Sequence, residues 1–146
     1  MLEFSYKTLK EKEELIIEEF SVFDDWVDKY SYFIELGKSL PTIKEELKKD
    51  NYLIKGCQSQ VWINAEYKDG KVYYYADSDA VITKGIVNLL VKVLSGSTPD
   101  EIISSPLDYI NKIGLKEHLS PTRANGLISM VKQMKLFAMA FKAQKG

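Results

Sequence analysis

The sequence predicts an α+β fold in which one small antiparallel sheet, a hairpin plus a short strand, packs against several helices. Apolar residues recur at helical spacing through most of the chain, but they alternate between residues 60 and 76. An Asp-Gly pair divides that alternating stretch, as in a hairpin turn. The chain has 146 residues, the length of one domain, so we expect residues 1–146 to form a single domain.

The N-terminal part of the chain predicts two amphipathic helices. Residues 7–20 mix lysine and glutamate with leucine, isoleucine and phenylalanine. A second helix is expected to begin after Asp24 or Asp25, since either side chain suits an N-cap. Leu40-Pro41 ends it, because proline disfavours helical conformation in the preceding residue. The apolar face of this second helix comprises Trp26, Tyr30, Phe33, Ile34 and Gly37.

The alternating stretch predicts the sheet. Residues 52–54 are expected to form the short strand, and residues 60–67 and 72–76 the two strands of the hairpin. Residues 68–71, Lys-Asp-Gly-Lys, form the turn, because Asp and Gly tolerate the positive φ angles that such turns require.

The C-terminal part predicts a long apolar helix, two short helices and a long final helix. Asp77 and Asp79 are expected to cap the long apolar helix. Its buried face is predicted to comprise Ile82, Gly85, Ile86, Leu89, Leu90, Val93 and Leu94, and its polar face Lys84, Asn88 and Lys92.

The remaining helices follow from their start signals. Thr98-Pro99 begins a short helix, residues 107–113 form a further turn or two, and Ser120-Pro121 opens the last helix. The predicted core face of the last helix comprises Ala124, Leu127, Ile128, Val131, Met134, Ala138 and Phe141.

The composition excludes several classes of function. The formal net charge is −1, which lacks the positive field of a nucleic-acid binder. One Cys and one His cannot form an intrachain disulfide, a zinc site of several Cys and His ligands, or a four-cysteine iron–sulfur site. No apolar run approaches the roughly 18 residues of a membrane span, and the N-terminus lacks the apolar region of a signal peptide. We therefore expect a cytoplasmic protein with a reduced thiol and no metal.

Cys57 is the candidate reactive residue. It follows Gly56 in a polar turn before the hairpin, where glycine lets the backbone approach another molecule closely. Nucleophilic thiols favour accessible positions of this kind, whereas a packing cysteine is more often found on an apolar face. Position alone leaves two interpretations open: a working thiol, or a buried loop cysteine without function.

Four segments resemble the SufE-type sulfur acceptors of the Fe–S metabolism-associated family, and they occur in the family's order. They are YFIELGKSLP (32–41), GCQSQVW (56–62), ADSDA (76–80) followed by Lys84-Gly85, and HLSPTRANGL (118–127). Each segment alone is a weak signal, and the four in order are a specific one. The last segment departs slightly from the family pattern, with Thr122 and Ala124 where serine is common.

The resemblance implies a persulfide relay and a fold similar to that of iron–sulfur scaffold proteins. In the family, a pyridoxal-phosphate cysteine desulfurase (SufS-like) takes sulfur from free cysteine. The SufE-type protein accepts that sulfur on its cysteine, here Cys57, stimulates the desulfurase, and passes the sulfur to a scaffold complex (SufB-like) for cluster assembly. Pyridoxal phosphate belongs to the desulfurase, so the resemblance implies no cofactor on this chain, which is expected to be a monomer or homodimer.

Four other residues are candidates to support Cys57. Arg123, the only arginine, is expected in the first turn of the last helix, where a cation opposes the helix dipole and calls for an anion. That anion is Asp77 or Asp79, a carboxylate of the desulfurase, or the Cys57 thiolate; a surface or structural ion pair is the alternative. His118 is either a general base for Cys57 or a local hydrogen-bonding residue. The two aspartates are primarily helix caps, with an effect on the cysteine loop or on docking as the second interpretation.

The aromatic residues near Cys57 also allow two interpretations. Trp62 and the tyrosines at 73–75 either line a pocket that protects the persulfide or are simply core residues of the hairpin.

Three alternative functions are compatible with parts of the sequence. The first is sulfur acceptance from a paralogous desulfurase outside the main cluster-assembly system. The second is a hydrolase that uses Cys57, His118 and Asn125, which the short chain and the lack of an oxyanion-hole motif disfavour. The third is an iron–sulfur scaffold, for which a single cysteine cannot supply the ligands.

Overall fold

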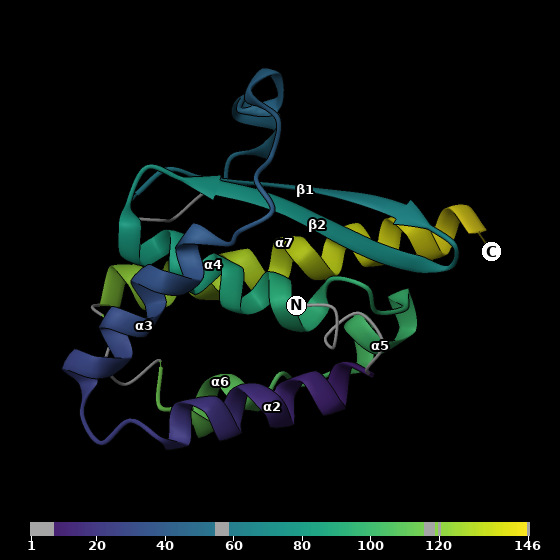
Figure 1. Ribbon diagram of the computed structural model, residues 1–146. Coiled ribbons are helices and arrows are strands. Elements are labelled where there is room, and N and C mark those ends of the chain that lie inside the picture. Colours follow the sequence, from purple (N-terminus) through teal and green to yellow (C-terminus); the bar gives the residue numbers. More distant parts are fainter. Residues whose placement is uncertain (1–7, 55–58, 116–118, 120, 146) are drawn as a thin grey trace.

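The computed structural model describes residues 8–54, 59–115, 119 and 121–145 (Figure 1). Its elements are α2 (Leu9–Ser21), α3 (Trp26–Lys38), the 3-10 turns η1 (Glu45–Leu47) and η2 (Asp50–Tyr52), β1 (Val61–Lys68), β2 (Lys71–Ser78), α4 (Val81–Leu94), α5 (Pro99–Ser104), α6 (Tyr109–Lys112) and α7 (Pro121–Lys145). The hairpin lies on one side of the molecule, α4 and α7 run beneath it, and α2 lies on the far side of α4 (Figure 1). The predicted α+β class is confirmed.

The hairpin forms as predicted, with the Asp-Gly turn at its tip. Asp69 and Gly70 have φ of 54° and 80°, the pair of positive values that this two-residue turn requires. One face of the sheet is buried against helices and includes Val61, Ile63 and Tyr74. The buried Tyr74 hydroxyl donates to Met134 O at 2.6 Å, so the hairpin and α7 share one core.

The short strand predicted at residues 52–54 does not form, so this prediction is wrong. Residues 50–52 wind into η2, and only Leu53 pairs with the sheet, through a single antiparallel bridge to Trp62. The sheet of the described residues therefore has two strands.

Helix α4 is the centre of the core. It packs against α3, β2, α2 and α7, and its buried residues cover more than the predicted face because Val87 and Val91 are buried as well. The predicted polar face is wrong at Asn88, which is fully buried. Its Nδ2 donates to Leu36 O (2.5 Å) and to Ser39 Oγ (3.2 Å), so the amide group satisfies carbonyl and hydroxyl groups at the end of α3.

A glycine allows α3 and α4 to cross closely. A methyl group added at Gly85 would lie 1.9 Å from Phe33 O, well inside van der Waals contact. One added at Gly37 would meet Gly85 N and Lys84 Cβ at 3.2 Å. The Lys84-Gly85 pair thus places the close crossing of these helices next to the N-terminal end of α4.

Helix α2 is held to α4 by a buried lysine. Thr8 and Glu11 form a capping box at its start. Lys12 is fully buried, and its Nζ donates to Ser95 O (2.8 Å) and Ser97 Oγ (3.0 Å) at the end of α4. A cation at a helix C-terminus interacts favourably with the last carbonyl groups, while burial lowers the pKa of Lys12 to about 8.

The remaining helix predictions hold in outline, with corrections at their ends and faces. Asp25, not Asp24, caps α3. Thr98 and Glu101 form a capping box at α5, with Pro99 in the first turn. Ile34 (37% exposed) and Ile128 (51% exposed) lie outside the core faces predicted for them, because the buried stripe of α3 runs through Leu36 and that of α7 through Met130.

Replacing Gly85 by alanine tests the helix crossing. Gly85→Ala should lower the free energy of unfolding by about 3 kcal/mol or more, since backbone atoms must separate to admit the methyl group. Gly37→Ala, with its nearest contact at 3.2 Å, should cost clearly less. Chemical denaturation of both variants measures the difference, and equal losses would contradict this account of the crossing.

Lys12 should make stability depend on pH in the alkaline range. Its pKa is about 8 in the folded chain against an ordinary 10.5, so the unfolded chain binds more protons between these values and stability rises with pH. The unfolding free energy of the wild type relative to Lys12→Met should therefore rise between pH 8 and 10.5, by up to about 1.4 kcal/mol per pH unit. A flat difference across that window would show that burial does not perturb Lys12.

Candidate functional site

Cys57 and His118 lie outside the described residues, so the site is built from the chain on either side of Cys57. Ile54 N–H donates to Val61 O at 2.8 Å, which brings the two flanks together at the start of β1. The segment that contains Cys57 is therefore joined to the sheet at one end of the hairpin. This is the open end of the hairpin, away from its Asp-Gly turn.

Asp79 binds Gln60, on the flank that follows Cys57, and does not cap α4. Its Oδ1 accepts from Gln60 N (3.1 Å), and its own N–H donates to Gln60 O (3.3 Å). The N-cap position of α4 is Ala80, which makes no side-chain capping bond. The capping prediction for Asp79 is wrong because β2 continues through Ser78, which leaves Asp79 opposite Gln60 rather than at the helix start.

Asp77 is not a cap either: it is the last-but-one residue of β2 and the centre of a charge cluster. Its Oδ2 lies 2.5 Å from Lys48 Nζ, and its Oδ1 lies 3.3 Å from Lys84 Nζ. Ser78 N–H also donates to Oδ1, at 2.8 Å. Burial alone would raise the pKa of Asp77, but the hydrogen bonds from Lys48, Ser78 and Lys84 outweigh it and hold this pKa below its ordinary range.

Trp62 lies directly opposite Asp77 in the hairpin register and is half-buried. Lys48 Nζ lies 5.6 Å from the centroid of the Trp62 ring, a cation–π arrangement. Leu53, which precedes the Cys57 segment in the sequence, forms an antiparallel bridge with Trp62, which follows it. Among the tyrosines, Tyr74 is core, while Tyr73 and Tyr75 are half-buried on the face of the sheet that carries Trp62. A pocket-lining role for these residues stays a prediction.

Arg123 lies in the first turn of α7, as predicted, and is partly buried. Its expected relation to Cys57 and that of His118 stay predictions, because Cys57 and His118 lie outside the described residues. The structure brings Asp77 and Asp79 to the chain that flanks the cysteine segment on either side.

Two members of the charge cluster were not predicted from sequence. Lys48 is one of 19 lysines and lies in a polar stretch, and nothing in its neighbours marks it. Lys84 belongs to the Lys84-Gly85 pair that resembles the SufE family, and this pair is the sequence signal that could have identified it. Its role in binding Asp77 appears only once β2 and α4 are placed together.

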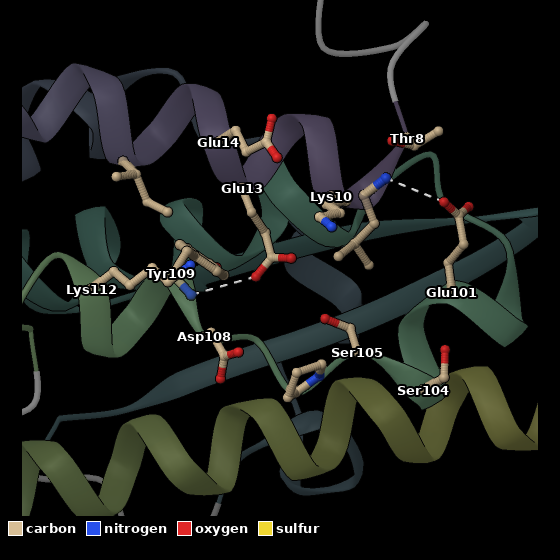
Figure 2. A pocket seen from close by; sticks show the side chains of 13 residues that line it. Thr8, Lys10, Glu13, Glu14, Glu101, Ser104, Ser105, Asp108, Tyr109 and Lys112 are labelled. Carbon is tan, nitrogen blue, oxygen red and sulfur yellow. Dashed lines mark hydrogen bonds between the residues drawn. The ribbon is translucent and has the colours of Figure 1, made fainter.

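A separate groove of about 430 Å³ lies between α2 and the α5–α6 region (Figure 2). It contains no residue of the hairpin or of α4. Two of its carboxylates hold elements together: Glu101 accepts from Leu9 N (3.2 Å), and Glu13 accepts from Tyr109 N (3.4 Å), as the dashed lines of Figure 2 show. These two carboxylates therefore serve the packing of α2 against α5 and α6.

No group of three or more His, Cys, Asp or Glu side chains that could bind a metal ion occurs among the described residues, which do not include Cys57 or His118. Of the helices in the described ranges, none has the length and apolar character to cross a membrane.

The amino-acid sequence matches a known family over most of its length. The model of the SufE family, described as an Fe-S metabolism associated domain, matches residues 14–138, and the chain belongs to this family. An uncharacterized SufE-like protein of Synechocystis sp. is 42% identical over 127 residues, which cover 87% of this chain and 80% of that protein. One of Rhizobium meliloti is 41% identical over 125 residues, covering 82% and 89%.

A solved structure supports the fold. The solution structure of a hypothetical protein from Thermus thermophilus has a TM-score of 0.75, with 21% identity, and the similarity covers 92% of this chain and 97% of that one. At this identity the likeness concerns the fold alone. The family connects the chain with Fe–S metabolism.

The Asp77 cluster should stabilise the fold in a pH-dependent way. The carboxylate pKa lies below its ordinary 3.8, so the stabilisation is complete above that value and is lost as pH falls through the folded pKa. Asp77→Asn should be less stable than the wild type at pH 7, and the difference should shrink below about pH 4. Urea denaturation from about pH 7 to pH 3 measures this. A difference that is independent of pH would contradict an ionised Asp77.

Proposed function

We propose that this protein accepts sulfur on Cys57 from the persulfide of a cysteine desulfurase and delivers it for iron–sulfur cluster assembly. The observation that carries the proposal is a single cysteine in the whole chain, inside the region that matches the SufE family. The flanks of that cysteine converge at the open end of the hairpin, where Ile54 bonds to Val61. The cysteine segment therefore joins the sheet at its end rather than between its paired strands.

The transfer step is a thiol exchange. The Cys57 thiolate attacks the outer sulfur of the donor persulfide, so a bond forms between Cys57 Sγ and that sulfur. The sulfur–sulfur bond of the donor breaks, and the donor cysteine leaves as a thiolate. The transferred sulfur keeps its oxidation state and its proton, and no external oxidant or reductant takes part.

A single thiol suits this chemistry. A second cysteine nearby would attack the persulfide on Cys57, release sulfide and leave a disulfide. Since the chain has one Cys, that intramolecular loss has no partner within it. The carried sulfur can therefore leave only by reaction with another molecule.

The division of labour follows from the same chemistry. The desulfurase, a SufS-like enzyme, cleaves the carbon–sulfur bond of cysteine with its own pyridoxal phosphate. This chain acts as its sulfur-transfer partner and stimulator in the cytoplasm, and a SufB-like scaffold complex receives the sulfur. Its own contribution is to position a thiol, for which it needs no cofactor or metal. Arg123, His118, Asp77 and Asp79 are the residues we propose to support Cys57.

Cys57→Ser should abolish stimulation of the desulfurase, because serine cannot take the sulfane sulfur and the donor persulfide is then cleared only by the reductant, at the basal rate. Alanine release by a SufS-like desulfurase, with cysteine and a thiol reductant, measures turnover with the wild type and with the variant. The variant should retain the circular dichroism spectrum and thermal unfolding of the wild type. Full stimulation by folded Cys57→Ser would refute the acceptor role. A desulfurase of a paralogous system, run in parallel, shows which enzyme is served.

A further inference from the structure

The segment at residues 44–53, which we call the arm, projects beyond the hairpin (Figure 1). Its backbone is joined to the sheet just outside its two ends and also at Leu53, which forms an antiparallel bridge with Trp62. Ile43 N donates to Ala76 O (3.1 Å) and Ile54 N donates to Val61 O (2.8 Å). The turn η1 has no buried residue. Little apolar burial therefore fixes residues 44–49, the part of the arm before η2, and side-chain contacts contribute to their position.

Lys48, between the two 3-10 turns, supplies such a contact. Its Nζ lies 2.5 Å from Asp77 Oδ2 on β2 and 5.6 Å from the Trp62 ring centroid on β1. The side chain of Asp77 is only 11% exposed, so water screens this pair less than it screens a surface ion pair. Lys84 binds the other carboxylate oxygen, and the arm is thereby connected to α4 as well as to the sheet.

These contacts involve the chain on both sides of the cysteine. In the sequence, Lys48 precedes Cys57 and Trp62 follows it. The Asp77 carboxylate binds Lys48, which lies on the flank before Cys57. The Asp77 backbone lies opposite Trp62, on the flank after Cys57, in the register of the hairpin. The Asp77 carboxylate thus adds a side-chain contact between the flanks of the Cys57 segment to the backbone bonds that join Leu53 and Ile54 to β1.

We propose that Asp77, acting through Lys48, is a positioning residue for sulfur acceptance at Cys57. The pair holds the arm against the hairpin, so the thiol is presented from a fixed base when the donor persulfide approaches. Neither side chain takes part in the bond changes. Their effect is on the orientation of reactants, to which the rate of a transfer step is sensitive. The inference rests on the proposed function, since it concerns the rate of that same step.

The test measures sulfur uptake by the full-length protein from a SufS-like desulfurase and cysteine, with rapid quenching and mass spectrometry, over a range of desulfurase concentrations. Lys48→Met and Asp77→Asn should each lower the maximal rate about tenfold, while the half-saturating concentration of desulfurase stays within about twofold. The loss in the double variant should be much smaller than the product of the two single losses, because both changes break the Lys48–Asp77 pair. Each change also removes one other contact, that of Lys48 with Glu45 or that of Asp77 with Lys84.

Two matched substitutions control for charge and length. Lys49→Met removes the same charge one residue away, from a side chain that is exposed and has no ion pair within the described structure, and it should leave the rate unchanged. Lys48→Arg keeps a cation that reaches Asp77 and should restore most of the rate.

Each other result overturns the inference. Wild-type rates in Lys48→Met, an equal loss in Lys49→Met, or multiplying losses in the double variant would show that the pair does not position Cys57. A change confined to the half-saturating concentration would make Lys48 a docking contact instead. Failure of the wild type itself to take up sulfur would refute the proposed function, which separates the two claims.

Discussion

The structure depends on the burial of α4. A helix with apolar side chains on nearly every side must be covered all round, and α2, α3, α7 and β2 supply that cover. Close packing requires Gly85 against the backbone of Phe33, and it buries two polar side chains, Asn88 and Lys12, that then bind the ends of neighbouring elements. Because α4 follows β2 directly, fixing this helix also fixes the open end of the hairpin.

The candidate site is a consequence of that placement. The end of β2 carries Asp77 and Asp79 follows it, while the start of α4 carries Lys84 within reach of Asp77. Asp79 then binds the chain after the cysteine segment, at Gln60, while Asp77 binds the chain before it, at Lys48. The core thus reaches the cysteine segment through two neighbouring carboxylates, each on a different flank. A reactive group held from a firmly packed base is the arrangement that a relay between two proteins needs.

The sequence predicted what local patterns determine. The hairpin, its Asp-Gly turn, the long apolar helix and the helix that begins at Thr98-Pro99 follow from periodicity and turn chemistry, and they are confirmed. The predictions were wrong where tertiary contacts determine the position of a side chain. Asn88 has the spacing of a polar face, but its amide is buried against the end of α3. Asp77 and Asp79 have the composition of a helix cap, but the strand continues through Ser78. Lys48 could not be distinguished from other lysines, since only the folded chain brings it to Asp77.

The central claim is that the single thiol of this SufE-family chain receives sulfane sulfur from another protein. Intact-mass and peptide mass spectrometry, after incubation with a cysteine desulfurase and cysteine, test it most directly. The account predicts a gain of about 32 Da, the mass of one sulfur atom, that a reductant removes and that maps to the peptide containing Cys57. An unchanged mass alongside an active desulfurase, or added sulfur elsewhere in the chain, would contradict it.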